Sequence, residues 1–181
     1  MMRVLSFSSS LASKLQTPRE TWRFLDLEFE NPYVNMAVEE AIVRNVGQEK
    51  VPNTVRFWRN RETVVVGFYQ DAEAETNLQL CQEQGVSVVR RFTGGGAVYH
   101  DLGNLNFSIA LRQNHRLVTN DLLKTFEILS QGAVLGLKAL GINNVQWEQG
   151  NCIAVNGFKL AGIAGCVRWG VFFCHGSILV S

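Results

Sequence analysis

Hydrophobic residues recur at two different spacings along the chain, and each spacing predicts a different kind of element. Apolar positions at helical intervals follow Asn31 and Pro32, a pair typical of a helix N-cap and first turn, and Gly47 ends that helix. Similar patterns predict helices over residues 72–85 and 121–140, both closed by a glycine. Stretches rich in valine, isoleucine and aromatic residues lie between these helices and predict strands.

The predicted strands are short, and most of them are separated by only a few residues. The segments 54–60 and 62–68 are expected to pair around a short turn near Asn60 and Arg61. Other strands are expected at residues 21–29, 86–91, 97–100 and 104–111, and as a run of short strands between 145 and 180. Strands outnumber helices, and short connections join antiparallel neighbours. The sequence therefore predicts an α+β fold with a mixed, largely antiparallel sheet flanked by helices.

The composition is that of an ordinary globular protein. The chain has 181 residues, of which 46% are hydrophobic and 18% charged, with a formal net charge of +1. So small a charge argues against a nucleic-acid partner, and no apolar run is long enough for a membrane span. One domain is expected over residues 21–181. The Ser-rich residues 1–20 are expected to be a disordered extension, with an organellar presequence as the alternative.

The cysteines are few and far apart in the sequence. They form no C-x-x-C pair and are too sparse for a disulfide scaffold, which predicts a reduced protein of the cytoplasm. Each is interpreted as a small buried hydrophobic residue rather than as a nucleophile. The four are Cys81, Cys152, Cys166 and Cys174.

The segment RRFTGGGAVYHDLGN, residues 90–104, carries the clearest chemical signal. Three consecutive glycines are a costly way to build a strand or helix, because glycine loses the most backbone entropy on ordering. Bare backbone lets a ligand approach N–H groups that bind anions, and Arg90 and Arg91 add positive charge. No Gly-Lys-Ser/Thr follows and no helix opens here, which excludes the P-loop and the dinucleotide fingerprint. The segment predicts a site for a phosphate-bearing or adenylated ligand over a β-rich floor.

Two polar residues interrupt apolar, strand-like segments further along. Lys159 lies in NGFKLAG and His175 in FFCHGSIL. From these segments alone, Lys159 is interpreted as a solvent-facing strand residue and His175 as a core histidine. A buried lysine would need a partner, and an anionic ligand would serve.

These segments together, in this order, resemble the lipoate–protein ligase A family of the biotin/lipoate protein ligase catalytic-domain superfamily. The resemblance runs from about Trp22 onward and rests on NPYVNMAVEEAI, RFWRNRETVVVGFYQ, RRFTGGGAVYHDLGNLNFSI, GNCIAVNGFKLAG and HGSILV. It implies a mixed sheet flanked by helices, with the ligand in a bent tunnel. It also implies that lipoate, ATP and Mg²⁺ give lipoyl-AMP and pyrophosphate. The lipoyl group would then pass to a lysine of an acceptor domain, in E2 subunits of 2-oxoacid dehydrogenases or in the glycine cleavage H protein.

The resemblance also assigns roles to individual residues. Lys159 matches the ligase lysine, which would neutralise negative charge as the phosphorus is attacked and as AMP leaves, and would not itself be lipoylated. Apart from the resemblance, a fatty-acid-like chain needs an apolar channel, and the strand residues Val65 and Phe68 are candidates to line it. The residues implied to contact lipoate or its adenylate are Trp58, Arg91, Thr93, Gly94, Gly95, Gly96, His100, Asn151 and His175.

Three features depart from the family pattern. Asn151-Cys152 stands where the family often has Asn-Asp, which leaves the metal ligands unassigned. The arginine that follows the lysine is Arg168, later than in many members. The chain stops at Ser181, where family domains continue. We therefore expect a truncated catalytic domain, or half of a two-chain enzyme with a separate small accessory subunit, of marginal stability alone.

Alternatives to an ATP-dependent ligase remain open at this point. An ATP-independent octanoyl or lipoyl transferase would need a cysteine thiolate beside a cation, and Cys152 and Cys174 are the nearest candidates. A biotin ligase is disfavoured, because the arginine-rich biotin motif is absent. A non-catalytic paralogue that binds lipoyl-AMP is the third alternative. The choice between lipoate and octanoate as the acyl group also stays open.

Overall fold

The computed structural model describes residues 20–148 and 151–180. Within these ranges the chain forms two sheets. The larger has seven strands in the order β1-β2-β6-β10-β9-β8-β7, and the smaller has three in the order β4-β3-β5. The elements are β1 (Arg23–Asp26), α1 (Pro32–Gly47), β2 (Thr54–Trp58), β3 (Thr63–Val66), α2 (Ala72–Glu75), α3 (Leu78–Glu83), β4 (Ser87–Arg90), β5 (Val98–His100), β6 (Asn104–Arg112), α4 (Leu122–Ala139), β7 (Val145–Glu148), β8 (Cys152–Val155), β9 (Phe158–Arg168) and β10 (Val171–Leu179).

Most strand pairs are antiparallel, as the short connections predicted. Only β1–β2 and β3–β4 pair in parallel in the described part of the chain. The run from β7 to β10 is a meander in which β10 pairs with both β6 and β9. The α+β prediction, with a mixed and largely antiparallel sheet, is confirmed.

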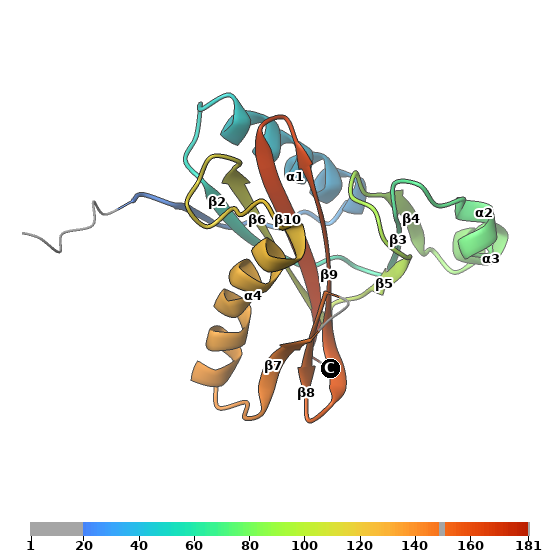
Figure 1. Cartoon of the computed structure of the whole chain (residues 1–181). Coiled ribbons are helices and arrows are strands. Elements are labelled where there is room, and N and C mark those ends of the chain that lie inside the picture. Colours follow the sequence, from blue (N-terminus) through green and yellow to red (C-terminus); the bar gives the residue numbers. More distant parts are fainter. Residues whose placement is uncertain (1–19, 149–150, 181) are drawn as a thin grey trace, which may run out of the picture.

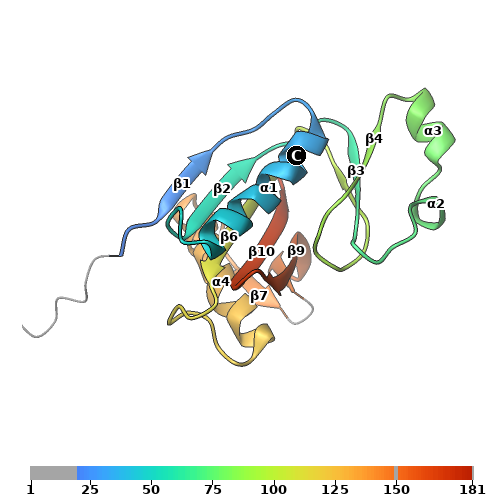
Figure 2. The ribbon, with the colours of Figure 1, turned by 90° about the horizontal axis from the view of Figure 1, so that it is seen from above.

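The two longest helices cover opposite faces of the large sheet (Figure 1). Side chains alternate between the faces of a strand, and β10 shows this directly. Phe172 and Cys174 pack in the core cluster that contains α4, whereas Phe173 packs in the cluster that contains α1. His175 has the same parity as Phe173 and therefore faces α1. The small sheet, with α2 and α3 beyond it, lies to one side of the large sheet next to α1 (Figure 2).

The helix ends follow the local signals in the sequence. The side chain of Asn31 accepts a hydrogen bond from the Tyr33 N–H at the start of α1. Asp121 caps α4 in the same way through the N–H groups of Leu123 and Lys124. These caps satisfy N–H groups that would otherwise have no partner in the first turn.

Two predictions about the elements were wrong. Residues 54–60 and 62–68 do not form a hairpin, because β2 joins the large sheet and β3 joins the small one. The buried side chain of Asn60 hydrogen-bonds to Asn35 and His100, which turns the chain away from β2. The helix expected at residues 72–85 is divided into α2 and α3, because Thr76 is extended and Asn77 caps a new helix.

Candidate functional site

A cleft of about 350 Å³ opens on the α1 side of the large sheet, beneath the small sheet. One row of its floor crosses four strands, from Trp58 through Asn106 and Ser177 to Gly162, which the strand registers place side by side. The cleft is lined by Met36, Trp58, Val65, Arg91, Gly95, Gly96, Ala97, Val98, His100, Asn106, Asn151, Lys159, Gly162, Ile163, Ala164, His175, Gly176 and Ser177.

Most of the residues that the sequence singled out meet in this one cleft. They come from β2, the loop between β4 and β5, β5 itself, the residue before β8, β9 and β10. Thr93 and Gly94 are the exceptions and lie behind the lining. The candidates that do line the cleft are Trp58, Arg91, Gly95, Gly96, His100, Asn151, Lys159 and His175. Their individual roles toward a ligand stay predictions.

Arg91 organises the glycine loop from behind. Its guanidinium donates hydrogen bonds to the carbonyl oxygens of Val65, Gly94 and Gly96, at 3.0, 2.8 and 2.7 Å. The N–H groups of residues 94–96 make no hydrogen bond within the described residues. Unpaired N–H groups of this kind are suited to an anion. The hydrogen bonds of Arg91 fix the shape of the loop that carries them.

Lys159 lies over Gly162 in the floor of the cleft. A Cβ atom at Gly162 would be in ordinary contact, at 3.4 Å, with both Cε and Nζ of the lysine. The lysine side chain forms no salt bridge with any residue in the described ranges. An unpaired ammonium and unpaired backbone N–H groups in the same lining suit this part of the cleft to a phosphate or carboxylate.

His175 ties the glycine loop to the floor and to α1. Its Nδ1 lies 2.7 Å from Glu39 Oε2, and its Nε2 lies 2.7 Å from Thr93 Oγ1. Glu39 and Thr93 are fully buried, so both nitrogens of the ring have a buried side-chain partner. His175 combines the two interpretations of the sequence, since it is a hydrogen-bonded buried residue whose edge also lines the cleft.

His100 lies on the opposite wall, in β5, with its Nδ1 at 3.0 Å from Asn60 Nδ2. The pKa of this imidazole is lowered from 6.5 to about 4, mainly by burial; His175 and Arg91 act in the same direction, and Asp101 opposes them. His100 is therefore neutral at pH 7 and presents an uncharged ring to the cleft.

The low pKa of His100 predicts a loss of stability in mild acid. Above pH 6.5 the ring is neutral in both the folded and the unfolded chain. Between pH 6.5 and about 4, the unfolded chain binds a proton that the folded chain does not, so the free energy of unfolding falls as the pH falls. The full loss is about 3 kcal/mol. Urea unfolding of wild type and His100→Gln across this range should show the shallower pH dependence in the variant, and equal slopes would contradict the assignment.

The other end of the cleft is apolar, with two unsatisfied polar side chains in its floor. Met36, Trp58 and Val65 pack together as a buried cluster. Trp58 Nε1 and both amide atoms of Asn106 are buried without a hydrogen-bond partner. Val65 lines the cleft as expected, but Phe68 does not, because its exposed ring stacks under the Arg168 guanidinium.

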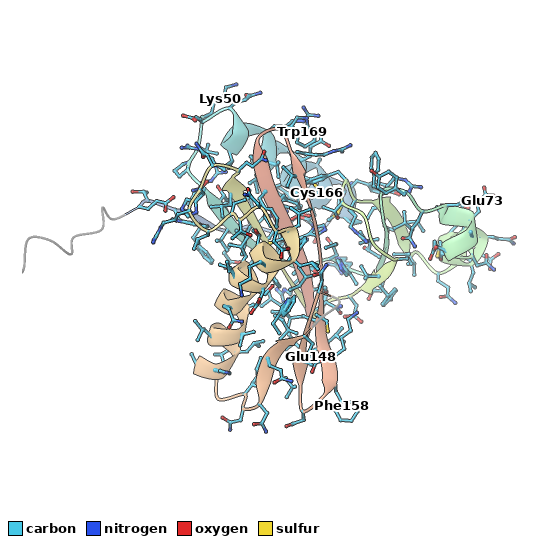
Figure 3. All side chains as sticks on the ribbon, viewed as in Figure 1. Lys50, Glu73, Glu148, Phe158, Cys166 and Trp169 are labelled. Carbon is cyan, nitrogen blue, oxygen red and sulfur yellow. The ribbon has the colours of Figure 1, made fainter. Side chains whose placement is uncertain are left out.

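None of the four cysteines is part of the cleft lining. Cys174 is buried on the α4 side, and burial raises its pKa to about 12. Cys166 lies toward the Trp169 end of β9, away from Phe158 and the adjacent Lys159, and burial raises its pKa as well (Figure 3). Cys152 pairs with Gly162 across β8 and β9 and is the cysteine of the large sheet closest to Lys159 in register.

The described residues do not offer a metal site of their own. They contain no group of three or more His, Cys, Asp or Glu side chains that could hold an ion. The described lining contains no carboxylate, and its unpaired oxygens include the amide oxygen Asn151 Oδ1. Mg²⁺ prefers one or two carboxylates together with substrate phosphates. The expected Mg²⁺ therefore finds no carboxylate ligand in the described part of the cleft.

Sequence reasoning missed three polar residues at this site. Asn106 interrupts the apolar strand NLNFSIAL, a signal that the sequence did contain. Asn35 and Glu39 lie four residues apart and on the same face of α1, among apolar positions, and both are fully buried. Polar residues at buried positions of a helix need partners, and here the partners lead to the cleft histidines.

Comparison with known proteins identifies the family of this chain. A family model described as the lipoyl protein ligase A/B catalytic domain matches residues 31–181. The chain belongs to this family. No helix in the described part of this lipoyl ligase A/B catalytic domain is long and apolar enough to cross a membrane.

The curated relatives include both transferases and ligases. Octanoyltransferase LipM of Moorella thermoacetica is 32% identical over an alignment 186 residues long, which covers 91% of this chain and 67% of the relative. Lipoate-protein ligase A subunit 1 of Thermoplasma acidophilum is 32% identical over 159 residues, which cover 83% of this chain and 59% of the relative. The lipoyl ligase A/B chain thus spans about two thirds or less of the length of these relatives.

Solved structures agree on the fold. A lipoate protein ligase of T. acidophilum with bound lipoic acid matches with a TM-score of 0.76 at 32% identity, over 87% of this chain and 67% of that one. Lipoate-protein ligase A bound with ATP matches with a TM-score of 0.77 at 33% identity, over 87% of this chain and 66% of that one. A bipartite lipoate protein ligase of T. acidophilum was studied with its E2 lipoyl domain. It matches with a TM-score of 0.78 at 31% identity, over 89% of this chain and 62% of that one. The predicted resemblance to lipoate ligases is confirmed.

Proposed function

We propose that this chain is the catalytic part of an ATP-dependent lipoate–protein ligase. The observation that carries the proposal is the composition of the cleft lining, which has an unpaired lysine and no thiol among its described residues. Transfer through an acyl-enzyme needs a thiolate, whereas acyl-adenylate formation needs cations and N–H donors around phosphate. The proposed reaction joins lipoate and ATP to give lipoyl-AMP and pyrophosphate.

The polar end of the cleft suits the chemistry of adenylation. The lipoate carboxylate attacks the α-phosphorus of ATP, and pyrophosphate leaves. Lys159 and the free N–H groups of the glycine loop are positioned around this end, where they would stabilise the added negative charge. Arg91 contributes by keeping the loop in the shape that exposes these N–H groups.

The apolar end suits the acyl chain. Met36, Trp58 and Val65 would bury a fatty-acid-like chain of the kind that lipoate carries. In the second step, the amine of an acceptor lysine attacks the carbonyl carbon of lipoyl-AMP, an amide forms and AMP leaves. We propose a lipoyl-acceptor domain as the partner, because a related bipartite ligase was studied with its E2 lipoyl domain. A separate accessory subunit belongs to the same proposal, since another relative is described as subunit 1.

An ATP-independent octanoyl transferase is the second candidate. Several relatives are octanoyltransferases, and Cys152 lies beside Gly162 in the strand register. If Cys152 were the nucleophile, transfer would survive Lys159→Ala and fail in Cys152→Ser. If the chain is a ligase, transfer should instead fail in Lys159→Ala and survive Cys152→Ser.

Pyrophosphate release tests the proposal directly. Purified protein with ATP and lipoate should release pyrophosphate, and omission of lipoate should abolish it. A lipoyl-acceptor domain should then gain mass by one lipoyl group in intact-protein mass spectrometry. Acyl transfer without ATP would replace the ligase with the transferase, and tight binding of lipoyl-AMP without transfer would indicate a non-catalytic paralogue.

Asn106 provides a prediction about the acyl end. Its buried amide has no partner in the described residues, which costs about 1–3 kcal/mol. Asn106→Leu should therefore raise the melting temperature of the ligand-free protein. In the complex we expect the amide to pair with bound lipoate, so the same variant should bind lipoate about tenfold more weakly. Calorimetry and thermal unfolding of the two proteins check this, and a less stable variant with unchanged affinity would refute it.

A further inference from the structure

A chain of buried hydrogen bonds runs from β2 through α1 to the cleft. It begins at Arg56, which is fully buried and can only donate. Arg56 Nη2 lies 2.7 Å from Asn35 Oδ1, and the Phe29 N–H lies 3.0 Å from the same atom. Two obligate donors therefore converge on one end of the Asn35 amide. That end must be the oxygen, so the orientation of this amide is fixed by its surroundings.

The remaining links follow from this first assignment. The other end of Asn35 is the NH₂ group, which donates to the Phe29 carbonyl at 2.7 Å and to Asn60 at 2.8 Å. The Asn60 atom that accepts must be Oδ1, so the NH₂ group of Asn60 points to His100. It lies 3.0 Å from Nδ1 of the ring. An NH₂ group can only donate, and Nδ1 must therefore be unprotonated.

We propose that Arg56, Asn35 and Asn60 hold His100 as the neutral Nε2–H tautomer, so that the ring presents one fixed hydrogen-bond donor to the cleft. Nδ1 is occupied by Asn60, and Nε2 makes no hydrogen bond with a described residue, while His100 lines the cleft. Asn35 and Asn60 are positioning residues in this arrangement, because they act through His100 and are not themselves part of the described lining. The low pKa of His100 is consistent with a ring that stays uncharged.

Helix α1 reaches both cleft histidines through buried side chains. Glu39 Oε2 lies 2.7 Å from His175 Nδ1, and Nε2 of that ring lies 2.7 Å from Thr93 Oγ1. Asn35, one turn earlier on α1, leads through Asn60 to a His100 whose Nε2 is a donor. The role of this donor rests on the proposed function. In that function the Nε2–H of His100 would donate to an oxygen of the lipoyl-adenylate without adding a positive charge to the cleft.

The tautomer can be measured without any substrate. Long-range ¹H–¹⁵N correlation spectra distinguish a protonated ring nitrogen from a bare one, and His100→Gln identifies the signals of His100. We expect Nε2 to carry the proton at pH 7 and Nδ1 to be bare. A spectrum with the proton on Nδ1, or with both nitrogens protonated, would overturn the proposal whether or not the protein is a ligase.

Two substitutions test the positioning role. In Asn60→Asp, the carboxylate cannot donate, so His100 should move its proton to Nδ1 and lose the donor at Nε2. In Asn35→Asp, the side chain still accepts from Arg56 but can only accept from Asn60. The Asn60 amide should therefore turn its NH₂ group to position 35 and its oxygen to His100, and the same change of tautomer is expected. Asn45→Asp is the matched control, because Asn45 lies on α1 and, among the described residues, its side chain bonds only to the Ala41 carbonyl.

The kinetic signature separates positioning from simple loss of structure. In an active ligase, both variants should lower kcat for lipoyl-AMP formation by about 10–100-fold with little change in KM for lipoate. Asn45→Asp should retain wild-type kcat. If the variants change the tautomer but leave kcat unchanged, the donor has no role in the reaction. If neither variant folds, the wild-type spectrum alone decides the tautomer.

Discussion

Replacing Lys159 with alanine is expected to lower the rate of lipoyl-AMP formation by about 10²–10³-fold, the range for loss of one electrostatic contact to developing charge. The side chain lies over Gly162 at the polar end of the cleft and has no acidic partner in the described residues. Its charge is therefore available to the phosphate. Because lipoate binds mainly through its apolar chain in this scheme, we expect the KM for lipoate to change much less than kcat.

The stability of the protein should hardly change in this variant. Lys159 is exposed, and removal of an exposed side chain without an ion pair usually changes the free energy of unfolding by less than about 0.5 kcal/mol. Lys138→Ala is the matched control, since Lys138 is an exposed lysine near the end of α4, on the opposite face of the sheet. Pyrophosphate release measures activity, and thermal unfolding measures stability. Near-normal activity in Lys159→Ala would remove the lysine from the mechanism.

Lys159→Arg should recover only part of the lost rate. The guanidinium keeps the positive charge, but it is planar and larger than an ammonium. Its charge is spread over a plane and would not lie at the position of the lysine ammonium. A variant as active as wild type would show that charge alone is sufficient.

The sequence predicted the site better than it predicted the connections between elements. The glycine segment was found because three glycines are out of pattern between strands, whereas Lys159 and His175 became candidates only through the family resemblance. The hairpin between β2 and β3 was predicted wrongly, because the turn signal at Asn60 is local while its cause is tertiary. Asn60 is buried between Asn35 and His100, partners that lie 25 and 40 residues away in the sequence.

The role of Arg91 could not be predicted for a similar reason. An arginine next to three glycines suggested a direct contact with an anion. The structure instead directs its donors to the carbonyl groups of the loop. Which atoms an arginine side chain reaches depends on the backbone path of the loop, and a sequence of glycines leaves that path undetermined.

Gly95 and Gly96 should respond differently when each is replaced by alanine. Only Gly95 has a positive φ, of 92°, and a Cβ atom there would lie 3.0 Å from Arg91 Nη2. That nitrogen already bonds to Gly94 and Gly96 and has little room to move. We therefore expect Gly95→Ala to cost about 1–3 kcal/mol of stability and to disturb the N–H groups that face the ligand.

Gly96→Ala is the informative partner of this variant. A Cβ atom at Gly96 meets nothing within 4 Å, so the fold does not require a glycine there. Yet Gly96 lines the cleft, and an added methyl group would occupy space next to the free N–H groups. Gly96→Ala should keep wild-type stability and still weaken lipoyl-AMP binding by about tenfold or more. Thermal unfolding and calorimetry separate the two effects. If Gly96→Ala binds normally, the bare backbone of this loop serves its conformation alone, through Gly95, and not the approach of the adenylate.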